Sequence, residues 1–402
     1  MNMNNKKIVV IGGGISGCVC SLKLSKFYNV TIDIYEQRED ILKSLPYCHL
    51  HVAGALYPEL TITECKSLFY ESLEFAKEFK QFLNIRPTII AYKSSSSYNP
   101  TQLIYKLHLI REIYAEIGTY IYGPPTEFFR IYTKEDILHY KTHGKLDEYD
   151  NIHTRYIETF CSLLKNINDI KYPFISVMEP GINQELLEKS LTELIYSSKK
   201  INVYKGTSVE KIEKKEEDWI INGDKRYDYL VNAMGYKSSD WFPVKELEYL
   251  EHKSSWLMDI SRDCFYDVNS IPEIAVIGER GTTDGMIQLT PIRVDKDITF
   301  QVHYMSYEST IIGRNGINKL TNNDISKRCE VAKNNIVKTF NIDGHKIKSH
   351  DIALDGVQRT LHYKNKRNSE VIINDKYAEI RLIKATGICH VSNQLYNYLS
   401  KN

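Results

Sequence analysis

The sequence predicts an α/β protein in which an N-terminal βαβ unit of the Rossmann type is interleaved with an α+β domain that contains an antiparallel sheet. The first observation is an apolar strand at 8–11 that runs directly into the glycine-rich segment Gly12–Gly17. The second is a helical stretch after these glycines, followed by a strand at 30–35 that ends in Glu36. The third is the segment 286–305, whose two alternating halves have the pattern of a β-hairpin. A G-x-G-x-x-G motif between a strand and a helix, with an acidic residue closing the next strand, is the context in which this motif binds a dinucleotide.

Each glycine of the motif has a physical role. Gly12 permits the tight turn after the strand, Gly14 lets the backbone approach a pyrophosphate, and Gly17 lets the helix pack closely on the strand. Together with Gly17, Ile15 and Ser16 form the first helical turn. Their free N–H groups lie at the positive end of the helix dipole, so we expect them to face the phosphates.

Glu36 indicates which dinucleotide is bound. Its carboxylate can accept hydrogen bonds from both hydroxyls of an adenosine ribose, and it would repel the 2′-phosphate of NADP. NAD and FAD remain. The position of the unit at the start of the chain favours FAD.

A later block of the sequence carries the resemblance to a known family. It begins near residue 179, contains helical and alternating segments, and ends in D-Y-L-V-N-A-M-G at 228–235. In this order the motifs resemble those of the FAD-dependent oxidoreductases of the D-amino-acid oxidase and glycine oxidase type. The resemblance implies that this last strand passes beneath FAD, with Ala233 and Gly235 at the cofactor. It also implies that Val209 meets the adenine through its backbone.

Two further segments fit the same resemblance. The small-residue segment 49–58 would lie against the flavin and the pyrophosphate through Ala53 and Gly54. At the C-terminus, a strand at 379–383 and a break at 385–387 precede a short helix at 391–399, whose N-terminus would face the flavin pyrimidine edge. The residues that the resemblance assigns to this edge are Lys384, as a positive charge, and Thr386. A solvated lysine at a strand end is the alternative for Lys384, and the chain lacks the glycine-dense stretch that the family carries before this helix.

The order of the segments predicts two discontinuous domains. The FAD-binding domain comprises 1–90, 173–236 and 371–402, and the substrate domain comprises 91–172 and 237–370. The serine run at 94–97 predicts a flexible crossing near the first boundary.

The hairpin predicts a substrate-facing surface. If residues 295–296 form its turn, Gln288 faces His303, Thr290 faces Gln301 and Met286 faces Met305, all on one side. The residues on the opposite side are apolar: Leu289, Phe300, Val302 and Tyr304. We therefore predict that Gln288, Gln301 and His303 line a substrate pocket. The alternative is a polar sheet face exposed to solvent.

Other side chains are candidates for contact with the substrate. His51 and His303 are possible acid–base groups, although a histidine can equally be a core or surface residue. Arg280 and Arg293 could pair with a substrate carboxylate or serve as surface charges. The arginine–tyrosine pair of the amino-acid oxidases has no clear counterpart here, which argues against an α-amino acid as substrate.

Composition excludes several other functions. The 402-residue chain has a net charge of +1, so no basic surplus indicates nucleic-acid binding. It contains no apolar run long enough to span a membrane. The 8 cysteines show no metal-binding spacing, which predicts no metal site and a reduced, cytoplasmic protein.

Together these observations predict an enzyme. We expect a noncovalently bound FAD to accept a hydride at N5 from a C–N or C–O bond of a small-molecule substrate, with O2 or another compound as the final electron acceptor. The alternatives are an FAD-dependent monooxygenase and a non-catalytic flavin-binding protein.

Overall fold

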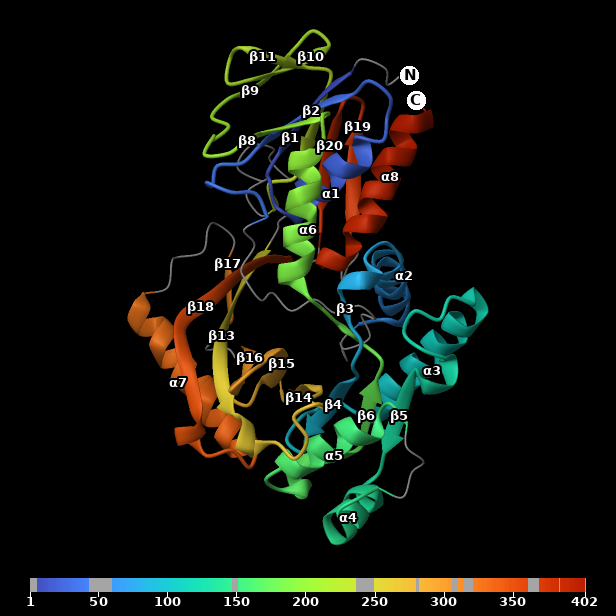
Figure 1. The fold of residues 1–402 in the computed structure, drawn as a ribbon, viewed down its shortest axis with the longest axis vertical. Helices are drawn as coiled ribbons and strands as arrows, with labels where there is room; N and C mark the ends of the chain where they lie inside the picture. The colour runs from blue at the N-terminus through green and yellow to red at the C-terminus, as the bar shows by residue number, and fades with distance from the viewer. Residues whose placement is uncertain are drawn as a thin grey trace.

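The computed structural model describes residues 6–42, 60–146, 151–235, 249–279, 282–305, 310–313, 321–360, 369–382 and 384–401. Within these ranges the chain forms two units, each built on one large sheet (Figure 1). The first unit contains a six-stranded sheet and the second unit a nine-stranded sheet. Two short strands, β3 (Leu83–Asn84) and β7 (Gly181–Ile182), pair where the chain passes between the units.

The sheet of the first unit has the order β19-β20-β12-β1-β2-β8. All its neighbouring strands are parallel except β19, which pairs antiparallel with β20. Its strands are β1 (Lys7–Ile11), β2 (Thr31–Tyr35), β8 (Ile201–Tyr204), β12 (Tyr229–Asn232), β19 (Glu370–Asn374) and β20 (Tyr377–Arg381). The carboxyl ends of β1, β2, β12 and β20 therefore share one edge, which is where such sheets bind ligands.

Both faces of this sheet are covered. Ile8 and Val10 face the helices α1 (Ile15–Leu24), α6 (Gln184–Ser197) and α8 (Ile388–Lys401). Val9 and Ile11 face the other way, toward a three-stranded sheet, because successive residues of a strand point to opposite faces. The strands of that small sheet are β9 (Ile212–Lys215), β10 (Asp218–Ile221) and β11 (Lys225–Tyr227). Burial on both faces explains why β1 reads as an uninterrupted apolar run.

The sheet of the second unit has the order β17-β13-β16-β15-β14-β4-β6-β5, with β18 also paired to β13. Its strands are β4 (Thr88–Lys93), β5 (Phe129–Tyr132), β6 (Ile170–Val177), β13 (Tyr249–Ser261), β14 (Glu273–Ile277), β15 (Met286–Val294), β16 (Asp297–Met305), β17 (Thr310–Gly313) and β18 (Ile347–Thr360). The fold class predicted from the sequence, a Rossmann-type unit with an α+β unit that contains an antiparallel sheet, is confirmed.

The two faces of the second sheet differ. One face packs on α4 (Lys134–His143), α5 (Thr154–Leu163) and α7 (Asn322–Thr339) through a continuous apolar core. On the other face, β4 and β6 pack on α2 (Ile62–Glu78) and α3 (Pro100–Ile117). In Figure 1, α2 lies between the two units, whereas α4 and α5 lie at the far end of the molecule. The face that carries α2 is therefore turned toward the first unit.

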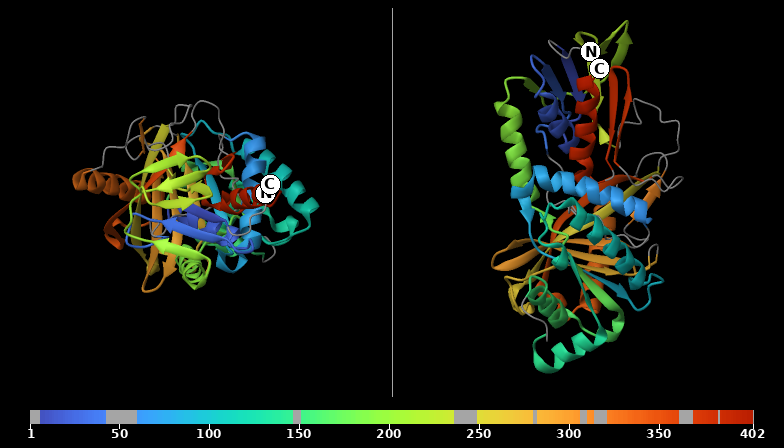
Figure 2. Two further views of the ribbon diagram at one scale, coloured as in Figure 1. Left: turned by 90° about the horizontal axis from the view of Figure 1, so that it is seen from above. Right: turned by 90° about the vertical axis from the view of Figure 1, so that its right-hand side faces the viewer.

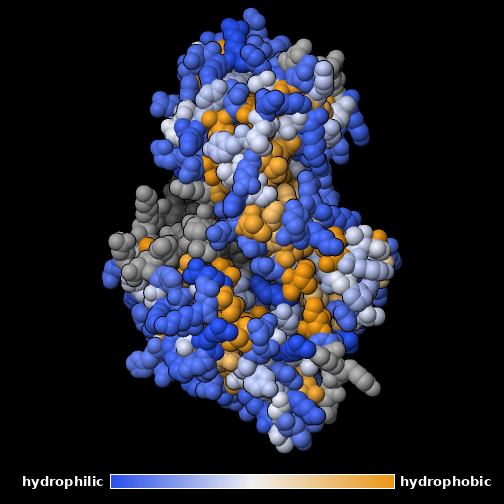
Figure 3. All heavy atoms as spheres, in the orientation of Figure 1, coloured by the Kyte–Doolittle hydropathy of each residue, from blue (hydrophilic) through white to orange (hydrophobic). Residues whose placement is uncertain are grey.

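Local sequence signals fix where several helices begin and end. Helix α2 begins at a capping box, in which Thr61 and Glu64 satisfy each other's backbone N–H groups. Helix α3 has Pro100 in its first turn and ends at Gly118, whose φ of +67° suits glycine. On the surface seen in Figure 3, apolar side chains gather over α6 and around the junction of the units, and the end with β9–β11 is mostly hydrophilic.

The strands near the expected domain boundaries belong to the second sheet. β4 straddles the boundary expected at residue 90, and β6 the one expected at 173. The serine run at 94–97 is not a crossing between the units, so that prediction is wrong. The segment is instead a turn within the second unit, tied by the bonds from Ser94 N to Asp169 O (2.8 Å) and from Ser97 N to Glu279 Oε2 (2.7 Å).

Candidate cofactor and substrate site

Of the four glycines in the loop after β1 (the glycine loop), Gly14 is the one whose place the described residues would leave to a side chain. Gly12 has a φ of +106°, and a Cβ atom there would lie 2.5 Å from Ala233 O. A Cβ atom on Gly17 would lie 1.9 Å from Gly12 O. Among the described residues, a Cβ atom on Gly14 would meet no atom within 4 Å. These residues therefore leave open the space in front of Gly14, the position expected to approach a pyrophosphate.

The N-terminus of α1 presents free donors at this space. Gly14 is the N-cap residue and has no side-chain cap, and the first turn holds no acidic residue. Ile15 and Ser16 are only partly buried. Their backbone N–H groups, with that of Gly17, lie at the positive end of the helix dipole, an arrangement that suits a phosphate.

Glu36 is buried and anchors the loop. Its Oε2 accepts a hydrogen bond from Gly13 N (2.8 Å), and its Oε1 accepts from Arg38 N (2.9 Å) and Arg38 Nε (3.0 Å). Burial opposes ionisation, but the hydrogen bonds from Arg38 and Gly13 outweigh it, so the pKa of Glu36 is lowered. The carboxylate is thus charged, as the binding of ribose hydroxyls requires.

Arg38 is a member of this site that the sequence analysis missed. Its guanidinium group covers the Glu36 carboxylate from the solvent side, with 41 % of the side chain exposed. A bound ribose would have to share the carboxylate with Arg38. The signal available was the Glu-x-Arg spacing after β2, which brings opposite charges together.

The segment that contains Val209 lies beside Glu36. Gly206 N donates to Arg38 O (2.8 Å), and Thr207 N donates to Glu36 O (2.9 Å). The Val209 side chain packs on the core between β1 and the three-stranded sheet. The backbone of 206–209 therefore lies next to the Glu36 carboxylate. The resemblance places the adenine on this side of Glu36.

The end of β12 meets the glycine loop directly. Ala233 N donates to Ile11 O (2.9 Å), and Ala233 O is the atom that Gly12 approaches. Gly235 adopts a φ of +63°. The expected cofactor residues Ala233 and Gly235 thus lie at the same edge as Gly14. The expected residues His51, Ala53, Gly54 and Arg280 fall outside the described residues.

The C-terminal segment also returns to this edge. After β20 the chain forms a short 3-10 turn (Ala385–Gly387) and enters α8 at Ile388, three residues earlier than predicted. Thr386 is buried with 2 % exposure, and Lys384 is partly buried just before the turn. Since β20 is parallel to β1 and β12, the N-termini of α8 and α1 face the same edge.

The predicted hairpin of the second unit has the predicted register. Gln288 lies opposite His303, Thr290 opposite Gln301 and Met286 opposite Met305. We call the side chains on this side of the sheet the polar face: Ser255, Glu273, Gln288, Thr290, Gln301 and His303. Ala275, directly opposite Gln288, packs in the core with α2 and α3, so the polar face is turned toward the first unit.

The polar face is buried rather than exposed. Gln288 is 4 % and Gln301 2 % exposed, whereas His303 is partly exposed. The alternative of a solvent-exposed face is therefore wrong. Gln301 Nε2 donates to Ser255 Oγ (3.0 Å), which fixes the amide in the row of side chains next to His303.

A buried ion pair at the end of this face was also missed. Arg86 Nη2 lies 2.9 Å from Glu273 Oε2, with side chains only 8 % and 0 % exposed. Gln288 Nε2 donates to Glu273 Oε1 (2.7 Å). Arg86 also lies against the crossing strand β7, because a Cβ atom on Gly181 would be 2.7 Å from Nη2. These two charges are 187 residues apart in sequence, and no local pattern links them.

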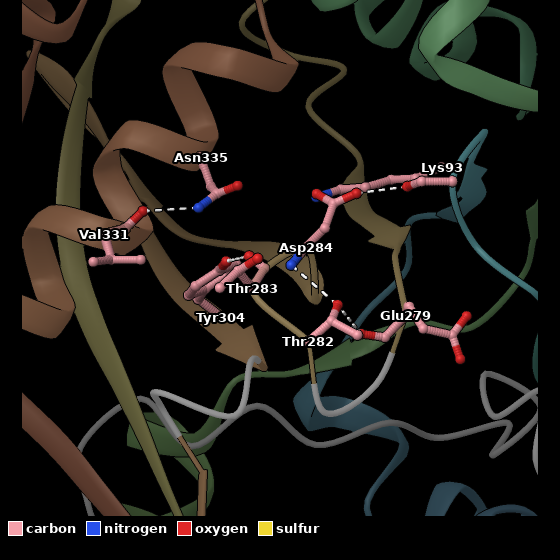
Figure 4. Close-up of polar contacts among 9 residues, drawn as sticks. Lys93, Glu279, Thr282, Thr283, Asp284, Tyr304, Val331 and Asn335 are labelled. Carbon is pink, nitrogen blue, oxygen red and sulfur yellow. Dashed lines mark hydrogen bonds and ion pairs between the residues drawn. The ribbon is translucent and has the colours of Figure 1, made fainter.

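The described residues of the loop after β14 make polar contacts with one another and with strands β4 and β16 (Figure 4). Glu279 N donates to Asp284 O (3.0 Å), Lys93 Nζ pairs with Asp284 Oδ1 (2.5 Å), and Tyr304 donates to Thr283 O. This loop carries the expected Arg280, which is outside the described residues. The other arginine considered, Arg293, lies in an exposed ion pair with Asp295.

Three further expectations concern cysteines, metal ligands and membrane-spanning helices. All seven cysteines within the described ranges are free, and these ranges contain no cluster of metal-binding side chains. Among the helices of the described part of the chain, none is long and apolar enough to cross a membrane.

Comparison with known proteins places the fold in a class. A family model described as an NAD(P)-binding Rossmann-like domain matches residues 10–42. No curated protein matches the sequence. Solved structures that match along almost the whole chain include oxidases and dehydrogenases.

Three of these structures illustrate the likeness. Glycine oxidase from Geobacillus kaustophilus has a TM-score of 0.63 at 11% identity, covering 98% of this chain and 94% of that one. L-proline dehydrogenase from P. horikoshii has a TM-score of 0.64 at 13% identity, covering 99% and 94%. L-α-glycerophosphate oxidase from Mycoplasma pneumoniae with FAD bound has a TM-score of 0.60 at 12% identity, covering 99% and 95%. At these identities the likeness establishes the fold, and it confirms the resemblance to the glycine oxidase type at that level.

Proposed function

We propose that this protein is an FAD-dependent oxidoreductase that removes a hydride from a C–N or C–O bond of a small metabolite. The observation that carries the proposal is the open space at Gly14, which lies at the free N-terminus of α1 in a chain with this two-domain fold. A glycine that no neighbouring atom of the described residues requires fits a ligand that does require it. A pyrophosphate has the charge and the size for that space.

The chain's own residues divide the binding of the dinucleotide among them. Backbone N–H groups of Ile15 and Ser16 hold the pyrophosphate, and Glu36 accepts hydrogen bonds from the ribose hydroxyls. The backbone at Val209 borders the adenine. Ala233 and Gly235 contact the part of the dinucleotide that extends from the pyrophosphate toward α8. When FAD is bound, its flavin supplies the hydride acceptor, N5.

The polar face of the second sheet is the proposed substrate side. Gln288 and Gln301 are held by Glu273 and Ser255, so their amides have set orientations. His303 is more accessible than either, which makes it our choice for the group that accepts or holds the substrate's proton. Burial of this face keeps water away from the site of hydride transfer. O2 or another acceptor then removes the electrons.

The first experiment is the visible absorption spectrum of the purified protein before and after acid precipitation. The bands of oxidised flavin, released into the supernatant by acid, are expected. Colour that stays in the pellet would mean a covalent flavin. A colourless protein that FAD does not stabilise, and that NAD does, would overturn the proposal.

A matched pair of variants tests the observation itself. Gly14→Ala adds a methyl group in open space at a φ of −75°, so the fold should be unchanged. FAD should nevertheless bind roughly 100-fold more weakly, because the methyl group occupies the place of the pyrophosphate. The control is Gly344→Ala, where the nearest atom to the new Cβ is Val337 Cγ2 at 3.6 Å. If Gly14→Ala retains FAD as the control does, the assignment of Gly14 is wrong.

A further inference from the structure

A buried acid lies at the N-terminal end of α8. Glu71, on α2, is only 3 % exposed, and its Oε1 accepts a hydrogen bond from Ser369 N (3.1 Å). Its Oε2 has no hydrogen-bond partner within the described part of the chain. That atom lies against Gly387, the residue before α8, since a Cβ atom there would be 2.5 Å from Oε2. Glycine at 387 is thus what admits the carboxyl group to this position.

This end of α8 shares an edge with the glycine loop. β20 leads into α8 as β1 leads into α1, and the two strands run parallel in one sheet. The helices α1 and α8 pack along each other, and α2 crosses beneath the start of α8, between the units (Figure 2). Glu71 therefore lies where the proposed cofactor site meets the second unit.

Burial makes ionisation of the Glu71 carboxyl group unfavourable. Burial raises the pKa of Glu71, and the nearby polar groups of Ser369 and the charge of His390 only partly oppose this effect. Glu74, also on α2, lies near Glu71 and adds a negative charge. On α8, His390 is occupied by Glu74, with Nδ1 2.9 Å from Glu74 Oε1. No ion pair with a lysine or arginine compensates Glu71 among the described residues.

Structure alone does not account for an acid here. A buried carboxyl group with one unsatisfied oxygen destabilises the fold relative to an amide or an apolar group of similar size. A buried acid next to a helix N-terminus can have a function if negative charge is added at that end of the helix. The dipole of α8 stabilises negative charge at this end, and a nearby acid that takes up a proton keeps the total charge low.

We propose that Glu71 is a positioning residue of the cofactor site, which takes up a proton when negative charge is added at the N-terminal end of α8. The inference rests on the proposed function, because hydride transfer to bound FAD is the source of that charge. Two electrons and one hydrogen leave the substrate as hydride. A separate proton comes from solvent and forms one O–H bond on Glu71, and no other bond of Glu71 changes.

The test is the midpoint potential of the bound flavin as a function of pH, from about pH 5 to pH 9. Over part of this range, the midpoint potential of the wild-type holoprotein should fall more steeply with pH than that of Glu71→Gln. The difference should correspond to about one additional proton taken up per two electrons. Glutamine matches the neutral acid in shape and cannot titrate. Glu78→Gln, on the same helix and paired with Lys23 (3.7 Å), is the control and should behave like the wild type.

Each outcome decides the inference. If midpoint potential against pH runs parallel in the wild type and Glu71→Gln, the inference is wrong and the proposed function is unaffected. The same holds if Glu78→Gln changes the pH dependence as much as Glu71→Gln does. A wild-type protein that binds no FAD overturns both. If Glu71→Gln does not fold, Glu71→Leu, which also cannot titrate, takes its place in the same comparison with the wild type and Glu78→Gln. A curve for Glu71→Leu that is parallel to that of the wild type overturns the inference, and a shallower one supports it.

Discussion

The glycine loop of the first unit and the polar face of the second unit recognise their proposed ligands by different means. At the loop, the expected ligand contacts come from main-chain N–H groups. Gly12 and Gly17 must be glycine because neighbouring backbone atoms leave no room for a side chain. At the polar face, Gln288, Gln301 and His303 project from a regular sheet whose backbone would accept many other residues. Recognition by the main chain therefore leaves a motif in the sequence, whereas recognition by side chains on a sheet leaves only an alternation.

The largest expected effect separates two glycines of the same motif. Gly17→Ala places a Cβ atom 1.9 Å from Gly12 O, between a strand and the helix packed on it. We expect it to destabilise the fold by more than about 4 kcal/mol, since backbone atoms on both sides must move. Without FAD, Gly14→Ala should unfold like the wild type, because the methyl group enters open space. Chemical unfolding followed by circular dichroism measures both, and a wild-type midpoint for Gly17→Ala would contradict the close packing.

This contrast also explains what could be predicted from the sequence. The first unit was predictable because β1 is a continuous apolar run and the turn after it needs glycines, and both are local properties. The hairpin register was predictable because Gln288 and His303 lie in short alternating segments joined by a tight turn. Arg38 was missed although it is only two residues from Glu36. Arg86 and Glu71 could not be predicted, because their partners, Glu273 and Ser369, are distant in the sequence.

The ion pair beneath the polar face gives the next largest effect. Arg86→Met leaves Glu273 buried without its counter-charge, which should cost about 3 kcal/mol of stability. The double variant Arg86→Met with Glu273→Gln should recover part of that loss, because no charge is then left unpaired. Arg293→Met, in the exposed pair with Asp295, is the control and should change stability little. A single variant no less stable than this control would mean that the pair does not support the polar face.

The role of His303 is tested by activity rather than by stability. With a substrate that reduces the flavin in hand, His303→Ala should keep FAD bound and lower kcat on the order of 100-fold, as expected for loss of an acid–base group. His345→Ala, an exposed histidine before β18, is the matched control. Turnover by His303→Ala equal to that of the control would return His303 to a structural role, and the polar face would need another proton acceptor.

The smallest effect concerns a histidine whose role lies in the fold of the second unit alone. Burial lowers the pKa of His153 to about 4, with Nε2 donating to Glu127 O (2.8 Å) and Nδ1 2.8 Å from Ser176 Oγ. The unfolded chain protonates near its ordinary pKa of about 6.5, whereas the folded chain resists protonation down to about 4. Stability from this group is therefore fully present above pH 6.5 and is lost as the pH falls toward 4.

From pH 7 to pH 5 this histidine should account for about 2 kcal/mol of lost stability. Unfolding measured at both pH values should show that loss in the wild type and in His143→Gln, an exposed histidine on α4, and a smaller loss in His153→Gln. Equal losses in all three proteins would mean that His153 is not held neutral. Because the described residues of the first unit include no buried histidine, the loss that depends on His153 belongs to the second unit.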